Sequence, residues 1–410
     1  MKADVVVVGS GPAGLAAAIA AKENGASDVL VLDREEHLGG ILRQCIHNGF
    51  GLHVFGEELT GPEYAARFAQ KAKALSIRFL TETMVLDVSA SRVITAVGPE
   101  TGLVTIEAGA VVLAMGCRER SAGALMIPGS RPSGVLTAGT AQRFVNIEGF
   151  MPGHNVVILG SGDIGLIMAR RMTLEGACVK MVLELMPYSG GLNRNIVQCL
   201  NDFDIPLRLS HTVTRLHGRR RLEGVSVAAV DEYGAPIRET EEYVPCDTLL
   251  LSVGLIPENE LSIGFGAQLD RMTNGPVVDS DMQTSVDGIF ACGNVVQVHD
   301  LVDFVTEEAT RAGRAAALYL KKTQTHGCCM TKPGQGVRYV VPQKLNDDGD
   351  DKTLFFRVAN VYRNCVTVAR CGDKVIARKK RPICTPGEME RLEVHGVDIC
   401  GDITVTVEEA

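Results

Sequence analysis

The sequence predicts an α/β fold with two Rossmann-like dinucleotide-binding domains, one inserted in the other, followed by a small C-terminal antiparallel β domain. Three observations lead to this prediction. A glycine-rich motif between an apolar strand and a helix occurs twice, and an acidic residue follows both copies at one spacing. Segments that alternate apolar and polar residues fill the last part of the 410-residue chain. Together these patterns favour one architecture.

The first glycine motif follows a buried strand. Val5–Val8 are four β-branched residues without polar alternation, which is typical of a parallel strand covered on both faces. GSGPAG then places Gly9, Gly11 and Gly14 before an alanine-rich helix, and the next apolar strand ends at Asp33, 24 residues after Gly9. Gly9 permits a tight turn, Gly11 lets the backbone approach a pyrophosphate, and Gly14 lets helix and strand pack closely. The helix N-terminus favours phosphates, and Asp33 can accept hydrogen bonds from a ribose. The neighbouring residues of this candidate cofactor site are Pro12, Ala13 and Arg34.

The second glycine motif repeats every part of the first. The strand in NVVILG leads into GSGDIG, which supplies Gly160, Gly162 and Gly165. The following strand ends at Glu184, again 24 residues after the first glycine. Two units with one spacing are hard to obtain by chance, so we expect a second dinucleotide site, which also includes Ile164.

The acidic residue of the second motif favours NAD(H) over NADP(H). No Arg or Lys follows Glu184 until Arg194. A 2′-phosphate would be repelled by the carboxylate and would find no cation nearby.

The segments around the two motifs add strands and one long helix. Short strand patterns separated by turn residues occupy residues 78–88, 91–99 and 102–109. An apolar strand at 110–116 then closes on Gly116 after the first motif, and another closes on Gly254 after the second. A later strand ends in Gly293 and Asn294, and residues 302–320 have the composition of a last helix.

This arrangement resembles the two-dinucleotide-binding-domain flavoproteins of the pyridine nucleotide-disulfide oxidoreductase superfamily, over about residues 1–320. The resemblance implies that GSGPAG with Asp33 binds FAD and that GSGDIG with Glu184 binds NAD. It also implies that Gly293 and Asn294 close the FAD site, where the family usually has Gly-Asp. The glycines that end the two strands crossing between the domains, Gly116 and Gly254, join the implied cofactor contacts.

The same resemblance gives the domain boundaries. We expect a discontinuous FAD-binding domain at 1–118 and 255–326, with an NAD-binding domain at 119–254 inserted in it. The remaining residues, 327–410, form the expected β domain, which we interpret as a possible partner-binding surface.

A narrower resemblance concerns residues 39–65, which begin GGILRQCIHNGFG. This stretch is similar to flavoprotein subunits that partner a glycerol-3-phosphate-dehydrogenase-like flavoprotein and a small cysteine-containing protein, or that are described as NADH oxidase subunits. It implies a hetero-oligomer in which this chain faces NAD. The location that we expect is cytoplasmic, because the apolar N-terminus is too short for a signal peptide and runs straight into a glycine motif. Gly40, Arg43 and Gln44 would then shape and polarise the flavin pocket.

The candidate catalytic residues in this stretch are Cys45 and His47. Family members that reduce disulfides use two cysteines here, because one thiolate attacks and the other resolves the mixed disulfide. Counted from Gly39-Gly40, the two positions are Leu42 and His47, and neither is a thiol. The chain also has no Cys-x-x-Cys pair. Dithiol chemistry through an internal pair is therefore the family activity that the sequence argues against.

Three functions from different classes remain. In the first, an FAD enzyme moves electrons between NAD(H) and a partner redox subunit or small acceptor, and hydride passes directly between the cofactors. In the second, a stand-alone NADH oxidase or peroxidase cycles Cys45 between thiolate and sulfenic acid, with His47 lowering the pKa of the thiol or acting as general acid. In the third, a flavin-binding scaffold serves assembly, which two intact glycine motifs argue against.

Composition and charge exclude other classes. The net charge of −8 and the pI of about 5.7 do not favour nucleic acid or an anionic membrane. No run of 18 apolar residues predicts a membrane span, and no signal peptide is expected. The basic runs at 219–221 and 378–381, and the acidic run at 346–351, are interpreted as solvated turns.

Half of the 12 cysteines follow residue 327. Their spacings match no zinc or ferredoxin pattern, so we expect packed free thiols and no metal site. These six residues are Cys328, Cys329, Cys365, Cys371, Cys384 and Cys400.

Overall fold

The computed structural model describes residues 1–321, 329–346, 348–396, 399 and 401–409. The chain divides into two compact units, Met1–Cys117 with Pro257–Ala410, and Arg118–Ile256. The second unit interrupts the first in the sequence, and the chain passes between them at β9 (Cys117–Glu119) and β18 (Leu255–Pro257). The predicted boundary at 326/327 lies outside the described residues.

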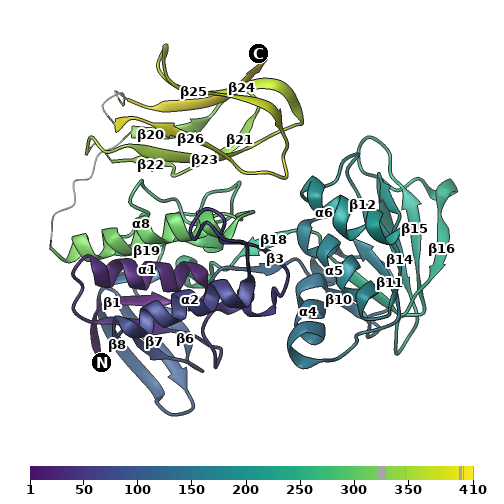
Figure 1. Cartoon of the computed structure of the whole chain (residues 1–410), viewed down its shortest axis with the longest axis horizontal. Helices are drawn as coiled ribbons and strands as arrows, with labels where there is room; N and C mark the ends of the chain where they lie inside the picture. The colour runs from purple at the N-terminus through teal and green to yellow at the C-terminus, as the bar shows by residue number, and fades with distance from the viewer. Residues whose placement is uncertain (322–328, 347, 397–398, 400, 410) are drawn as a thin grey trace. The chain divides into compact units, whose positions relative to one another are not determined.

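The first unit is built on a seven-stranded sheet with the order β5-β2-β1-β8-β7-β6, to which β19 adds beside β8. Figure 1 labels β1, β8, β7, β6 and β19 of this sheet. β1 (Lys2–Val8) runs parallel to β2 (Val29–Leu32) and to β8 (Gly102–Leu113). The four predicted valines of β1 are buried, as a strand covered on both faces requires. The other strands of this sheet are β5 (Arg78–Leu80), β6 (Met84–Val88), β7 (Val93–Gly98) and β19 (Ile289–Ala291).

Strand β8 differs from the prediction. The sequence predicted two strands, 102–109 and 110–116, but the chain continues as one. Its first half pairs antiparallel with β7, and its last residues pair parallel with β19. The composition of β8 changes where its neighbouring strand changes from β7 to β19. The sequence pattern alone cannot distinguish such a change from the end of one strand and the start of another.

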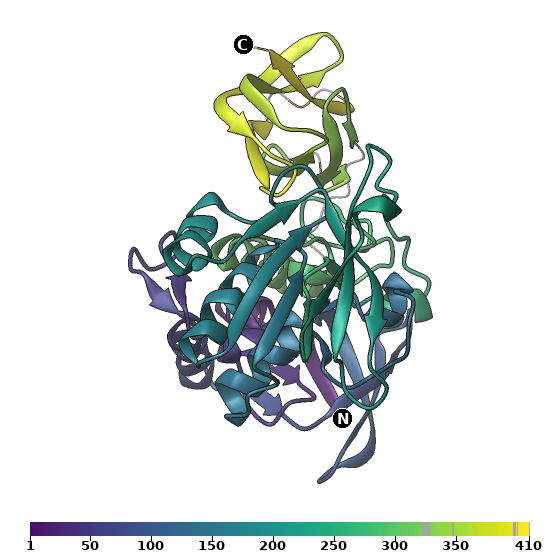
Figure 2. The ribbon, with the colours of Figure 1, turned by 90° about the vertical axis from the view of Figure 1, so that its right-hand side faces the viewer.

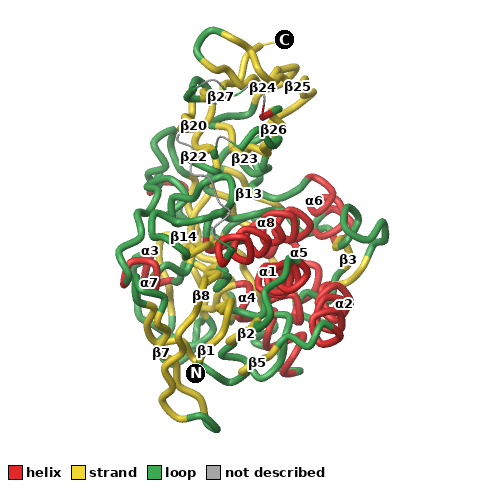
Figure 3. The backbone as a smooth tube through the Cα atoms, turned by 90° about the vertical axis from the view of Figure 1, so that its left-hand side faces the viewer, coloured by secondary structure: helices red, strands yellow, loops and turns green. Residues whose placement is uncertain are grey.

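Helices α1 (Pro12–Glu23) and α8 (Val302–Leu320) lie side by side over this sheet (Figure 1), and Figure 3 shows both on one side of its strands. They approach so closely that a methyl group at Gly313 would lie 2.0 Å from the Ala17 carbonyl oxygen. The predicted last helix has the observed bounds. α2 (Gly61–Ala74) begins with a capping box in which Thr60 and Glu63 satisfy each other's backbone N–H groups.

The second unit has a five-stranded parallel sheet with the order β10-β17-β11-β12-β13 (Figure 2). Its strands are β10 (Val135–Thr137), β11 (Asn155–Leu159), β12 (Cys178–Glu184), β13 (Leu207–Leu209) and β17 (Thr248–Leu251). An antiparallel sheet of β14 (His211–His217), β15 (Gly224–Ala229) and β16 (Glu242–Pro245) covers it. The helices are α3 (Ala122–Leu125), α4 (Ala138–Arg143), α5 (Asp163–Leu174) and α6 (Asn193–Cys199).

The C-terminal strands form two sheets, as predicted for a β domain. One has the order β22-β20-β27-β24-β25 and the other β21-β23-β26. Within the described residues their pairs are antiparallel apart from β20 with β27. The strands are β20 (Cys329–Pro333), β21 (Val337–Val341), β22 (Lys344–Leu345), β23 (Lys352–Val358), β24 (Tyr362–Cys371), β25 (Lys374–Cys384), β26 (Glu390–Val394) and β27 (Ile403–Glu409).

The prediction of a turn for the basic run at 378–381 is wrong. The run lies within β25, at the edge of its sheet. Lysines on an edge strand discourage pairing with other chains, and this explains their place in a strand. The remaining short elements are β3 (Asn48–Phe50), β4 (Leu59–Thr60), α7 (Glu260–Gly264), the 3-10 helices at 40–44, 201–203, 238–240 and 293–295, and a π-helix at 144–148.

The C-terminal strands belong to the first unit because they are hydrogen-bonded to it. The backbone of Gln343 and Lys344 donates to the Val278 carbonyl, and the Gln343 side chain accepts from the Val278 N–H. Arg357 of β23 donates to the carboxylate of Asp300. These contacts order the β domain against the segment that precedes α8.

Candidate functional site

The first glycine loop has the geometry that its sequence predicts. Gly9 has a φ of 103°, and a methyl group there would lie 2.5 Å from the Ala114 carbonyl oxygen. At Gly14 the methyl would lie 1.8 Å from the Gly9 oxygen, so glycine is needed for helix and strand to pack. At Gly11, by contrast, nothing lies within 4 Å. The open side of this loop faces the N-terminal end of α1, where a pyrophosphate would fit.

Asp33 is held against this loop by a serine. Its Oδ2 accepts hydrogen bonds from the Ser10 N–H at 2.6 Å and the Ser10 hydroxyl at 2.5 Å, and its Oδ1 accepts from the Glu35 N–H at 2.8 Å. The acid therefore fixes the loop in addition to any bond to a ribose. Sequence reasoning did not single out Ser10, although the repeated Gly-Ser-Gly was a signal for it.

Residues far apart in the sequence converge on this loop. A methyl group at Gly40 would lie 2.9 Å from the Gly11 Cα, and one at Gly293 would lie 2.8 Å from the Ala13 Cβ. Pro12 is the first residue of α1, whereas Arg34 is exposed beside Asp33. The structure thus brings together most of the residues predicted to bind the first cofactor.

Cys45 follows the 3-10 helix Gly40–Gln44. Its thiol donates to the Ile41 carbonyl at 3.4 Å, and its own carbonyl accepts from the Gly61 N–H at 2.9 Å. Burial raises the pKa of the Cys45 thiol from 9.0 to about 12. The thiolate is the nucleophilic form of cysteine, so this raised pKa disfavours a nucleophilic role for Cys45, which is partly exposed.

His47 lies two residues further on, partly buried beside an aromatic ring. Its Nδ1 is 3.0 Å from the Asn48 carbonyl oxygen, and its ring lies 5.1 Å from that of Phe50. Gln44 is buried. The Arg43 side chain lies against Gly39, and a methyl group at Gly39 would lie 3.3 Å from the Arg43 Cγ.

The second glycine loop repeats the first. A methyl group at Gly160 would lie 2.1 Å from the Ser252 carbonyl oxygen, and one at Gly165 would lie 2.7 Å from the Gly160 oxygen. At Gly162 the nearest atom would be the Ser252 hydroxyl oxygen, 3.3 Å away. Ile164 is partly buried in the first turn of α5.

Glu184 repeats the role of Asp33. Its Oε2 accepts from the N–H and the hydroxyl of Ser161 at 2.9 and 2.6 Å, and its Oε1 accepts from the Met186 N–H at 3.0 Å. Ser161 occupies the position that Ser10 has in the first loop. The two units therefore build the same arrangement of glycine loop, serine and acid twice.

The two strand-ending glycines and Asn294 line open or polar positions. Gly116 and Gly254 have φ values of 75° and 102°, and a methyl group at either would meet nothing within 4 Å. The Asn294 amide donates to the Cys117 sulfur at 3.5 Å and its Oδ1 accepts from the His299 N–H at 3.0 Å. Asn294 thus has hydrogen bonds that a carboxylate at this position could only partly replace.

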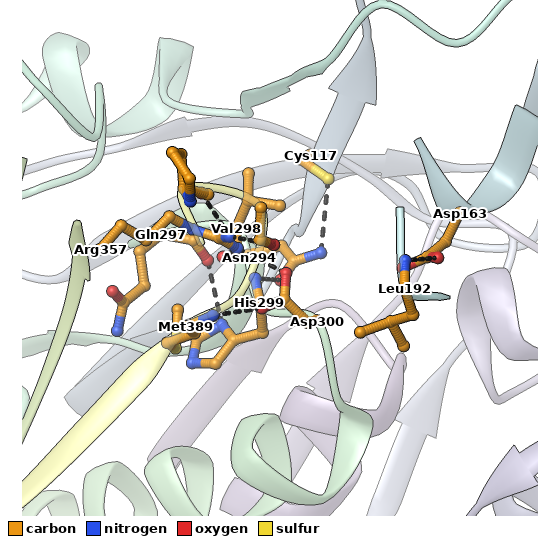
Figure 4. A network of polar contacts seen from close by, with 12 residues as sticks. Cys117, Asp163, Leu192, Asn294, Gln297, Val298, His299, Asp300, Arg357 and Met389 are labelled. Atoms are coloured by element: carbon orange, nitrogen blue, oxygen red, sulfur yellow. Dashed lines mark hydrogen bonds and ion pairs between the residues drawn. The ribbon is translucent and has the colours of Figure 1, made fainter. Parts of the chain in front are cut away.

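Sequence reasoning missed a buried polar network behind Gly293, drawn in part in Figure 4. Glu308 lies in the second turn of α8, which begins at Val302, and is 1% exposed. Its Oε1 accepts from the Gly293 N–H at 2.6 Å. His299, which the sequence gave no role, is also buried, with Nε2 3.2 Å from the other Glu308 oxygen.

The described cysteines are free thiols, including the tail residues Cys329, Cys365, Cys371 and Cys384. Cys328 and Cys400 lie outside the described residues. In the part of the chain that the structure describes, no three or more His, Cys, Asp or Glu side chains are grouped to hold a metal ion. Over the same residues, no helix combines the length and apolarity needed to cross a membrane.

Comparison with known proteins shows the family of this chain. A family model described as "Pyridine nucleotide-disulphide oxidoreductase" matches residues 3–320. An opine oxidase subunit from Agrobacterium tumefaciens (strain Ach5) is 27% identical over 77% of this chain, and the match spans 64% of that relative. Hydrogen cyanide synthase subunit HcnB of Pseudomonas protegens is 26% identical over 78% of this chain and 70% of its own length.

A solved structure shares the fold. Thioredoxin reductase of T. acidophilum superposes with a TM-score of 0.62, at 26% identity, over 78% of this chain and 98% of its own. The chain therefore spans less than two thirds of the opine oxidase relative, but nearly all of this smaller reductase.

Proposed function

The chain belongs to the pyridine nucleotide-disulphide oxidoreductase family, whose members use FAD and NAD(P)H, and from this premise we propose a specific electron path. In this proposal, electrons move between NAD(H) and a partner redox subunit or small acceptor, without an internal redox disulfide. The observation that carries it is the pair of matching glycine loops, each with an acid held by a serine, in a chain whose segment 39–51 holds a single cysteine, Cys45.

The residues of the first loop fit a bound FAD. Gly11 leaves room for a pyrophosphate, and Gly40 and Gly293 close around the same loop. When bound, FAD supplies two-electron hydride chemistry with the nicotinamide. Under this proposal, Arg43 and Gln44 hold and polarise the flavin pocket, and no side chain is needed as a nucleophile.

NAD(H) is the proposed coenzyme of the second loop. Glu184 presents a carboxylate, which accepts hydrogen bonds from hydroxyl groups and repels a 2′-phosphate. Asp163 and Ile164 open α5 at the end of this loop, where the helix N-terminus favours phosphate.

We also propose that the chain works as one subunit of a hetero-oligomeric dehydrogenase. Two of the similar proteins are named as subunits, of opine oxidase and of hydrogen cyanide synthase. The partner would be a second flavoprotein dehydrogenase subunit, a small redox protein, or both, and a glycerol 3-phosphate-oxidising partner is the candidate that residues 39–65 favour. The C-terminal β domain supplies a surface for it.

The alternative of a stand-alone oxidase or peroxidase requires Cys45 to be a thiolate. The raised pKa of its thiol weighs against that requirement, because the thiolate is the species that peroxide oxidises.

The test is reduction of FAD-loaded protein by NADH or NADPH, followed by transfer to a dye acceptor or to an aromatic disulfide. We expect dye reduction, with NADH preferred by at least about tenfold, and no disulfide reduction. Disulfide turnover at a rate comparable to dye reduction would contradict the proposal. Stoichiometric co-elution of a second subunit from the native source, identified by mass spectrometry, tests the hetero-oligomer.

A further inference from the structure

A buried carboxylate lies behind the turn that closes the proposed flavin site. Glu308, on the second turn of α8, is 1% exposed, and the neighbouring Glu307 is partly exposed and pairs with Arg311 and Arg391. An isolated buried carboxylate is costly, so the groups that satisfy Glu308 indicate what it does.

Each oxygen of Glu308 has a partner on the segment that follows β19. Oε1 accepts from the Gly293 N–H at 2.6 Å, and Oε2 accepts from the Gln297 amide at 3.2 Å. His299 Nε2 lies 3.2 Å from Oε2, and His299 Nδ1 lies 3.0 Å from the Gln297 carbonyl oxygen. Burial alone would raise the pKa of Glu308, but His299, the Gly293 N–H and Gln297 outweigh it and lower the pKa.

These partners fix the turn toward the proposed cofactor. Gly293 has a φ of 75°, and its Cα faces the Ala13 methyl in the first turn of α1. The His299 N–H donates to Asn294 Oδ1 at 3.0 Å, and the Asn294 amide reaches Cys117. One carboxylate thus sets both the backbone of Gly293 and, through His299, the side chain of Asn294.

The same segment also has hydrogen bonds to the C-terminal β domain, some of whose residues are drawn in Figure 4. Arg357 donates to the Val298 carbonyl at 3.0 Å and to Asp300 Oδ1 at 2.5 Å. The Met389 N–H donates to the other Asp300 oxygen at 2.6 Å, and the Phe355 ring lies 6.1 Å from that of His299. The segment 293–300 is therefore held both by Glu308 of α8 and by the C-terminal β domain.

We propose that Glu308 is a positioning residue for the flavin site: with His299 it holds the turn Gly293–Asn294 in the shape that binds FAD. This inference rests on the proposed function, because it places FAD at the first glycine loop. It adds a residue outside every glycine motif to the determinants of FAD affinity and of the flavin's reduction potential.

The test compares Glu308→Gln with Glu307→Gln, the same change one residue earlier on the same helix. A glutamine at 308 has one acceptor oxygen, so it can serve Gly293 or Gln297 and His299, but not all of them. We expect Glu308→Gln to bind FAD about 10- to 100-fold more weakly by fluorescence titration, as for a lost charge-assisted hydrogen bond, and Glu307→Gln to stay within about threefold of wild type.

The second readout is the midpoint potential of the flavin, measured against a reference dye in protein saturated with FAD. A residue with only a general structural role would leave this potential unchanged once the site is full. We expect Glu308→Gln to change it and Glu307→Gln not to. If Glu308→Gln does not fold, His299→Gln takes its place, and we expect it to change FAD affinity and potential in the same direction but by less. The exposed His395→Gln is then the control.

Wild-type affinity and potential in Glu308→Gln, or in His299→Gln, would overturn the inference while leaving the proposed function intact. Wild-type protein that does not bind FAD would overturn both.

Discussion

At Cys45, the surroundings of the sulfur decide what chemistry the residue can take part in. A redox-active cysteine needs a low pKa and access, usually from a cation or a helix N-terminus. Here the thiol donates to a carbonyl, and burial raises its pKa to about 12. The high pKa argues against a thiolate, so we propose that Cys45, which is partly exposed, is a pocket residue and not a redox centre.

Alkylation measures this directly. A pKa of about 12 leaves about a thousandth of the thiolate that an ordinary thiol has near pH 7.5, partly offset by greater nucleophilicity. We expect iodoacetamide to modify Cys45 at least about 30-fold more slowly than the exposed Cys178, followed by peptide mass spectrometry. Equal rates would show that Cys45 is an activated thiol.

The glycines of the first loop separate into structural and ligand-facing residues. A methyl group at Gly14 would overlap the Gly9 oxygen, and one at Gly11 would meet nothing. We expect Gly14→Ala to lower the free energy of unfolding by about 3 kcal/mol or more, and Gly11→Ala to change it by about 1 kcal/mol or less. Gly11→Ala should still weaken FAD binding at least about tenfold in a fluorescence titration. If Gly11→Ala binds FAD as tightly as wild type does, the pyrophosphate does not bind at this loop.

At the scale of elements, the repeat was the strongest signal. Two loops with one spacing predicted two strand–helix–strand units, and the structure has a helix directly after each loop, α1 and α5. Ser10 and Ser161 were not predicted, because a serine's partner depends on how the next strand pairs with the first. Strand β25 was missed because four consecutive basic residues obscure a period of two.

Asp279, in the turn after Val278, makes the stability of the fold depend on pH. Burial raises the pKa of Asp279 to about 6, while its Oδ1 accepts from the N–H groups of Asp281 and Gln283. The folded state therefore binds a proton that the unfolded state has lost, so this group's contribution to stability falls as the pH rises from about 4 to about 6.

Asp279→Asn keeps an acceptor for both N–H groups and removes the charge. We expect it to match wild type near pH 4 and to exceed it by about 1 to 3 kcal/mol at pH 7, measured by denaturant unfolding. Asp270→Asn, at a similar but less buried turn, is the matched control. A wild-type pH profile in Asp279→Asn would refute this assignment.

At the scale of the molecule, the C-terminal β domain is fixed to the first unit. Its β character was predicted, although strand β25 was missed, and its attachment was not predicted, because Arg357 and Asp300 are 57 residues apart and no pattern links them. The side chains of this pair are 12% and 18% exposed. The buried network at Glu308 escaped prediction for the same reason, since burial follows from the packing of distant segments.

Breaking this attachment has a measurable cost. Removing one partner of a mostly buried ion pair leaves the other charge unsatisfied, so we expect Arg357→Met to lower the free energy of unfolding by about 3 to 5 kcal/mol. Arg370→Met breaks the more exposed pair with Glu408 in the same domain and should cost about 1 kcal/mol or less. Equal losses in the two variants would mean that Arg357 does not anchor the domain.

The central claim, that electrons pass through FAD without a protein redox centre, is tested most directly by anaerobic titration with NADH. FAD-loaded wild type and Cys45→Ser are titrated side by side while the flavin absorbance is followed. We predict one NADH per bound FAD in both proteins. A second equivalent consumed by wild type and absent in Cys45→Ser would make Cys45 a redox centre and contradict the claim.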